Sequence, residues 1–66
     1  MSKRQIVRNM ANRAFSGESS DTHAMSYIAR RIGYSVPKAK QFLRDLNRMG
    51  MVTIAFSKRS VIFVND

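Results

Sequence analysis

The feature that most constrains the fold is a short turn, Gly33-Tyr34-Ser35, set between two stretches whose apolar residues recur at helical spacing. Glycine adopts a positive φ without the penalty of a Cβ, so Gly33 is suited to end one helix. Ser35 can accept a hydrogen bond from the first free N–H groups of the next helix, and Pro37 fits the first turn of that helix, where a missing N–H costs little. The sequence therefore predicts two helices joined by a tight turn.

The helix before this turn has an uncertain start. Asp21 or Thr22 could cap a longer helix, or Ser26 could cap a shorter one with Ala24–Met25 extended before it. Its end at Gly33 is clear. The apolar positions of this stretch are Ala24, Met25, Ile28, Ala29 and Ile32.

The helix after the turn is predicted from Val36 to Met49, with Gly50 as its stop. One side carries an apolar stripe, and the other side is basic. Asp45 is the exception on the basic side, and we predict that it pairs with Gln41 or Arg48 along the helix rather than accepting a hydrogen bond from a cytosine. The apolar stripe consists of Ala39, Phe42, Leu43, Leu46 and Met49.

Residues 2–15 have the spacing of a further amphipathic helix. Ser2 and Gln5 fit a capping box, and Gly17 fits a left-handed stop. A Ser/Gly/Asp-rich loop follows over residues 16–22, with His23 in or beside it. The apolar face consists of Ile6, Val7, Met10, Ala11, Ala14 and Phe15.

The last segment changes from helical to strand character. Residues 51–56 and 61–64 are rich in β-branched and aromatic side chains, and residues 57–60 separate them, which indicates a β-hairpin with Lys58 and Arg59 at its tip. The predicted fold class is α+β, mainly α: a three-helix core with a C-terminal two-stranded β-hairpin.

The chain has 66 residues, with 12 Lys and Arg against 4 Asp and Glu, and therefore a formal net charge of +8. A chain of this length makes one small domain, so we expect residues 1–66 to form a single unit. A charge of this size says nothing about the fold, but it makes a polyanion the expected partner.

Catalysis and metal binding are not expected. The sequence has no cysteine and one histidine, His23, so ordinary zinc ligands cannot be assembled. Neither a nucleophile–base set nor a glycine-rich phosphate loop is present, and we expect no enzyme activity, no cofactor and no small-molecule effector. No uncharged apolar run approaches the roughly 20 residues of a membrane helix, and no signal peptide is recognisable.

Residues 25–52, MSYIARRIGYSVPKAKQFLRDLNRMGMV, resemble the winged helix-turn-helix regulators of bacteria and phages. The resemblance rests on Ile28-Ala29, on the turn Ile32-Gly33-Tyr34-Ser35, on Leu43 and Leu46, and on Gly50-Met51-Val52. In size the chain is similar to the stand-alone fimbrial-operon regulators. The resemblance implies a helix-turn-helix core with the hairpin as a wing, located in the cytoplasm on the nucleoid.

A helix held by its apolar side can lay its opposite side in the major groove, which is about 12 Å wide. Gln41 can pair bidentately with adenine, Arg44 or a lysine can pair with guanine, and Arg48 is placed to meet a phosphate. The resemblance also directs Lys58 and Arg59 toward an adjacent minor groove or the backbone. The predicted DNA-binding residues are Ser35, Pro37, Lys38, Lys40, Gln41, Arg44, Arg48, Lys58, Arg59, Arg30 and Arg31, with Arg8 and Arg13 as further candidate phosphate contacts.

The expected function is therefore that of a sequence-specific transcription regulator that binds double-stranded DNA. The alternative is a winged-helix adaptor whose basic face docks an acidic protein, such as a polymerase or a host factor. Because a single module covers only about 600–1,000 Å² of DNA, we expect a homodimer, cooperative neighbours or a partner protein. The hydrophobic first helix and the outer edge of the terminal strand are the candidate surfaces for self-association. An Arg-rich targeting segment over residues 1–15 is a weaker alternative, because its removal would uncover the core.

Overall fold

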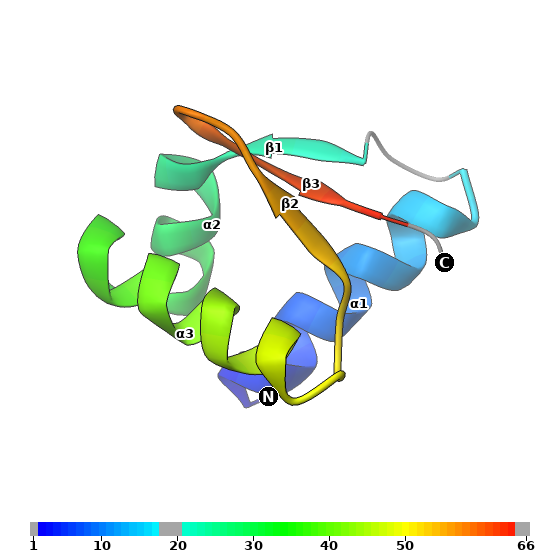
Figure 1. The fold of residues 1–66 in the computed structure, drawn as a ribbon, viewed down its shortest axis with the longest axis horizontal. Helices are drawn as coiled ribbons and strands as arrows, with labels where there is room; N and C mark the ends of the chain where they lie inside the picture. The colour runs from blue at the N-terminus through cyan, green and yellow to red at the C-terminus, as the bar shows by residue number, and fades with distance from the viewer. Residues whose placement is uncertain (1, 18–20, 65–66) are drawn as a thin grey trace.

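Three helices and a three-stranded antiparallel sheet make up the chain in a computed structural model, which describes residues 2–17 and 21–64 (Figure 1). This arrangement confirms the predicted α+β class with a C-terminal hairpin. The sheet lies across one side of the molecule and the helices lie on the other. The elements are α1 (Lys3–Phe15), β1 (Thr22–Ala24), α2 (Met25–Ile32), α3 (Val36–Arg48), β2 (Ile54–Phe56) and β3 (Ser60–Phe63).

Helix α1 begins where the sequence predicts, but only half of the predicted capping box forms. The backbone N–H of Gln5 donates to Oγ of Ser2 at 3.1 Å. The side chain of Gln5 does not return to Ser2; its Nε2 donates to Oδ1 of Asn9 at 2.9 Å, one turn further along. Gly17 has a φ of 82°, as expected for the residue after a helix end.

The start of α2 differs from both sequence alternatives. The helix begins at Met25, after a capping residue, Ala24, whose side chain makes no hydrogen bond, so neither Asp21, Thr22 nor Ser26 caps it. The backbone N–H of Met25 instead donates to the carbonyl oxygen of Arg59 at 2.9 Å. A contact with a distant loop thus replaces the local cap, and the extended residues before the helix form a strand.

Strand β1 is the element that the sequence analysis missed. It pairs antiparallel with β3, with Thr22 opposite Ile62 and Ala24 opposite Ser60. The strand order is β1-β3-β2, so β3 is central and has a partner on each side. The prediction that the terminal strand has an exposed outer edge is therefore wrong. His23, predicted in or beside the serine loop, lies beside it in β1, partly buried against Tyr27 and Phe63.

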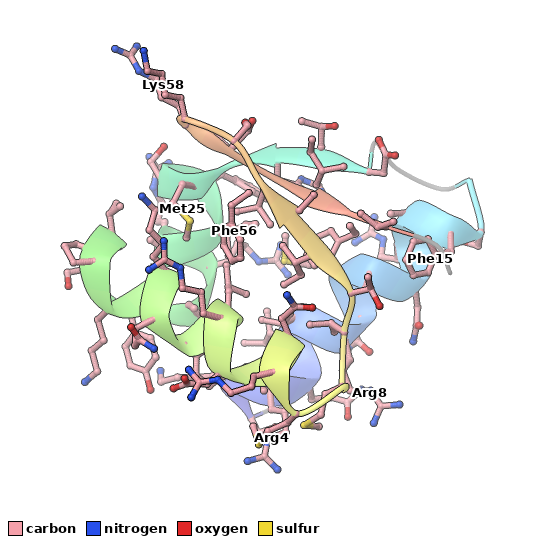
Figure 2. The ribbon with its side chains drawn as sticks, in the orientation of Figure 1. Arg4, Arg8, Phe15, Met25, Phe56 and Lys58 are labelled. Atoms are coloured by element: carbon pink, nitrogen blue, oxygen red, sulfur yellow. The ribbon has the colours of Figure 1, made fainter. Side chains whose placement is uncertain are left out.

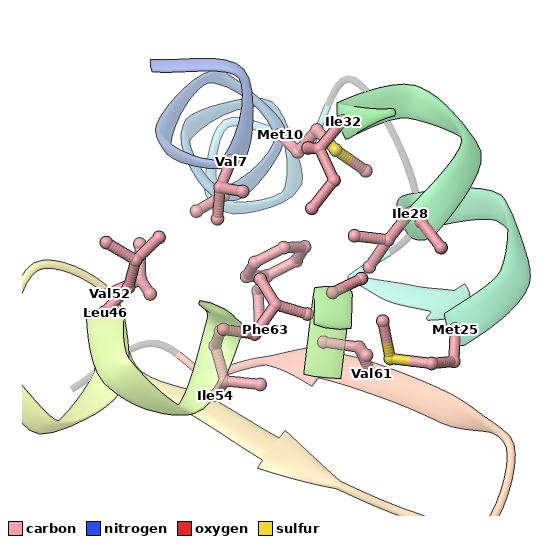
Figure 3. Close-up of a cluster of buried hydrophobic side chains, with 14 residues drawn as sticks. Val7, Met10, Met25, Ile28, Ile32, Leu46, Val52, Ile54, Val61 and Phe63 are labelled. Atoms are coloured by element: carbon pink, nitrogen blue, oxygen red, sulfur yellow. The ribbon is translucent and has the colours of Figure 1, made fainter. Parts of the chain in front are cut away.

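The core fills the space between the helices and the sheet. Figure 3 shows Phe63 of β3 between Val7 and Ile32 on the helix side and Ile54 on the sheet side, and Phe63 is 1% exposed. Two large side chains predicted on apolar faces are exposed instead: Phe15 is 44% exposed and Met49 is 59% exposed. Phe15 is the last residue of α1 and Met49 follows the last residue of α3, so both extend beyond the core.

The turn between α2 and α3 has the predicted geometry. Gly33 has a φ of 78°, and the N–H groups of Gly33 and Tyr34 both donate to the carbonyl oxygen of Ala29, at 2.9 and 3.0 Å. Ser35 occupies the capping position of α3 but its side chain makes no capping hydrogen bond, which corrects the predicted role of its hydroxyl group. Nζ of Lys3 donates to the carbonyl oxygen of Ile32 at 2.7 Å, so α1 satisfies the end of α2.

No helix among the described residues has both the length and the apolar character needed to cross a membrane.

Candidate nucleic-acid interface

The outward side of α3 is basic because the apolar residues face the core. Ala39 and Leu43 are fully buried, Leu46 is 1% exposed, and Phe42 is half-buried against the core. The opposite residues are therefore turned to solvent, and all of them are exposed except Lys40, which is half-buried. We call the following set the α3 face: Pro37, Lys38, Lys40, Gln41, Arg44 and Arg48.

The hairpin tip has a fixed backbone and carries two cationic side chains, Lys58 and Arg59. The N–H of Ser57 donates to the carbonyl oxygen of Ser60 at 3.0 Å, and the two hydroxyl groups are hydrogen-bonded to each other. Figure 2 shows Lys58 projecting from the tip away from the rest of the molecule. Among the described residues, neither Lys58 nor Arg59 has a side-chain hydrogen bond or ion pair.

A pocket joins the hairpin tip to the start of α2 and the first turns of α3. We call it the wing pocket; its volume is about 260 Å³. Three cationic side chains, from α3 and from the hairpin tip, meet around it, and none of the acidic residues that the structure describes lines it. Its lining residues are Met25, Ser26, Val36, Lys40, Lys58 and Arg59. The structure thus brings together the predicted hairpin contacts and Lys40 of the α3 face.

Two cations of the α3 face rest on aromatic rings. Nζ of Lys38 lies 4.6 Å from the centre of the Tyr34 ring, and Nζ of Lys3 lies 4.7 Å from it. The guanidinium carbon of Arg44 lies 5.6 Å from the centre of the Phe56 ring. These distances are those of cation–π contacts, which restrict the side chains without neutralising their charge.

Asp45 holds two further residues of the α3 face. Nε2 of Gln41 donates to its Oδ1 at 3.0 Å, and Nη2 of Arg48 donates to the same oxygen at 3.1 Å. The predicted pairing of Asp45 along the helix is confirmed with both partners.

Asn47 links α3 to the hairpin and was not singled out by the sequence. Its Oδ1 accepts from the N–H of Ile54 at 3.3 Å, and its Nδ2 donates to the carbonyl oxygen of Ile54 at 3.5 Å. Tyr34 and Phe56, the rings beneath Lys38 and Arg44, pack against the core, and their contacts with these two cations were likewise not predicted from the sequence. Asn47 and Phe56 each join α3 to β2, and Tyr34 lies in the turn before α3, so the helical periodicity of α3 gives no signal for these contacts.

The remaining predicted arginines lie elsewhere. Arg30 is exposed in the last turn of α2, four residues after Ser26 and therefore on the same side of the helix. Arg31 and Arg13 line a separate pocket of about 70 Å³ beside His23, and Arg8 lines a third, of about 240 Å³, beside Phe15. The structure does not bring these last three arginines to the wing pocket.

Polar clusters of other kinds do not stand out in the described part of the chain. No group of three or more His, Asp or Glu side chains there is arranged to hold a metal ion. His23 Nε2 is buried and has no hydrogen-bond partner within residues 2–17 and 21–64, but the ring packs against two aromatic rings, 5.7 Å from Tyr27 and 5.7 Å from Phe63. His23 is thus placed as a packing residue.

No family model, no curated protein and no solved structure matches this chain.

Proposed function

We propose that the protein is a sequence-specific regulator of transcription that binds double-stranded DNA with the α3 face in the major groove and the hairpin tip on the adjacent backbone or minor groove. The observation that supports this most strongly is the wing pocket. It places Lys58 and Arg59 beside Lys40, so the hairpin tip and the α3 face present their charge on one continuous surface.

The dimensions of α3 suit this mode of binding. The helix has 13 residues, which gives about 20 Å of length, and the major groove admits one α-helix in a width of about 12 Å. Its buried side is held by α2, β2 and the core, so that the opposite side is free to approach base edges. Gln41 and Arg44 lie near the middle of this side, where contact with bases is expected.

Phosphate contacts are proposed around the base contacts. Lys58, Arg59 and Lys40 would neutralise phosphates on one flank, and Arg30 shares the side of α2 that lines the wing pocket. Contacts from Arg8, Arg13 and Arg31 stay predictions of the sequence alone, because these residues line other pockets.

A second copy on a neighbouring half-site is part of the proposal, because one module covers too little DNA to define a long site. The edge of the terminal strand does not serve for self-association, since β3 is paired on both sides. The end of α1 is the better candidate, because Phe15 and Val64 are 44% and 37% exposed beside the pocket that Arg8 lines.

The test is selection from a random pool of duplexes at about 150 mM salt, followed by a salt titration on the enriched sequences. We expect one motif to be enriched, as an inverted or direct repeat, with an affinity that falls steeply with salt. A pool without any enriched motif, together with an affinity that vanishes at moderate salt, would contradict the proposal. The adaptor function would then be favoured, and tight binding to an acidic protein would support it.

A further inference from the structure

Asp45 stands in an unusual place for an acidic side chain. It lies among the cations of the α3 face, and its side chain is 48% exposed, so burial does not explain it. One of its oxygen atoms accepts from both Gln41 and Arg48. Exposed pairs along a helix contribute little to stability, so the effect of this arrangement on Gln41 is of more interest than its contribution to folding.

The carboxylate fixes the orientation of the Gln41 amide. An ionised carboxylate only accepts hydrogen bonds, so the nitrogen of the amide, and not its oxygen, must face Asp45. The reversed amide would place Oε1 of Gln41 against Oδ1 of Asp45. An amide nitrogen carries two N–H donors, and Asp45 takes one of them. Gln41 is left with one free N–H donor and one free acceptor.

This remaining pair of groups matches one purine better than the other. In the major groove adenine presents the N6 donor and the N7 acceptor, whereas guanine presents two acceptors, N7 and O6. One donor and one acceptor complement adenine, while guanine would leave Oε1 of Gln41 facing an acceptor. Arg48 forms an ion pair with Asp45 and offsets its negative charge, so the carboxylate can lie close to DNA with less repulsion from the phosphates.

We propose that Asp45 is a specificity-determining positioning residue, which holds Gln41 in the amide orientation that selects adenine over guanine. This inference rests on the proposed function, with the α3 face in the major groove. Arg44 is not held by Asp45; it lies over Phe56, and its donors have no partner among the described residues that would keep them from guanine.

The test repeats the duplex selection with Asp45→Ala. Without the carboxylate the amide of Gln41 turns freely, so we expect the preference for adenine at one position of the motif to fall about tenfold. Affinity for random duplexes should rise at the same time, because a negative charge near the phosphates is removed. A residue that only supports the fold would not lower the preference for adenine while raising the affinity for random duplexes.

Three further variants make the result specific. Asp45→Asn keeps the size of the side chain but can both donate and accept, so the same loss of preference is expected without a change in packing. Asp21→Asn removes an equal charge from an exposed residue outside α3, and should leave every base preference unchanged. In a Gln41→Ala background, Asp45→Ala should have no further effect at the affected position.

The outcomes separate this inference from the proposed function. A wild-type protein that enriches no motif overturns both. A motif that is enriched by the wild type and kept with the same adenine preference by Asp45→Ala and Asp45→Asn overturns the role of Asp45 alone. Equal weakening on all sequences overturns it as well, because Asp45 would then support the helix rather than the choice of base.

Discussion

The α3 face and the hairpin tip carry the same kind of charge but hold it differently. On α3, Lys38 rests on Tyr34, Arg44 lies over Phe56, and Gln41 is bonded to Asp45. At the hairpin tip the backbone is fixed, while the side chains of Lys58 and Arg59 have no polar partner in the part of the chain that the structure describes. Side chains that are already ordered lose less entropy on binding, which favours contacts with defined geometry, such as those to base edges. Free lysine and arginine side chains suit phosphates, where charge matters more than geometry.

The largest effect is expected for a substitution that tests whether the α3 face and the hairpin unfold together in one cooperative transition. Phe63 lies in the core at 1% exposure, between the helices and the sheet (Figure 3). Phe63→Ala should lower the free energy of unfolding by about 3–5 kcal/mol, because it removes a buried ring and leaves a cavity. The check is urea unfolding followed by circular dichroism, with the milder Phe63→Leu as a control. Loss of the strand signal alone, with the helices intact, would show that the hairpin unfolds separately.

The next effect concerns base contacts on the α3 face. Gln41→Ala and Arg44→Ala should each cost about 1–3 kcal/mol of binding free energy on the selected duplex, and much less on random duplexes. Each is exposed, so the fold should be unaffected. The measurement is the equilibrium affinity of each variant for both kinds of duplex. Equal weakening on every sequence would make these residues phosphate contacts and would remove the contrast with the hairpin tip.

The hairpin tip should give the opposite pattern. The double variant Lys58→Ala, Arg59→Ala should bind all duplexes less tightly by a similar factor, and the slope of log affinity against log salt should fall by about two units. Arg4→Ala is the control, since Arg4 lies at the far end of the molecule from Lys58 (Figure 2) and should change the slope little. A slope unchanged by the double variant would place the hairpin tip away from the DNA.

Local signals in the sequence were sufficient to predict the helices and one part of the candidate site, the pairing of Asp45. Gly33, Pro37 and Gly50 act within their own turns, so the bounds of α3 could be predicted to within a residue. Asp45 could be assigned to Gln41 and Arg48 because residues three and four apart meet on any helix. Phe15 and Met49 show the limit of this approach, because periodicity gives a direction but does not say where the core ends.

Contacts between distant segments could not be predicted. Strand β1 has three residues, and it exists because β3 lies beside it rather than because its own sequence favours a strand. The same applies to the start of α2, where the carbonyl group of Arg59 replaces a local cap. The contact of Lys3 with Tyr34 also depends on how α1 crosses the turn, which one helix alone does not specify.

The smallest expected effect addresses the link between the two regions. Asn47 binds the backbone of Ile54 through both atoms of its amide, and so holds β2 against the end of α3. Asn47→Ala should lower the free energy of unfolding by about 1 kcal/mol, because the N–H of the buried Ile54 loses its partner. Asn47→Asp is the matched comparison: it keeps the acceptor for that N–H but sets a carboxylate oxygen against the carbonyl oxygen of Ile54, so a loss of stability in this variant alone would report the longer contact. If the hairpin tip and the α3 face bind one duplex together, Asn47→Ala should also reduce affinity more than its loss of stability explains, because the tip is no longer held beside Lys40. Affinity that is unchanged for the folded variant would mean that the two regions bind independently, and the continuity of the wing pocket would then have no role in binding.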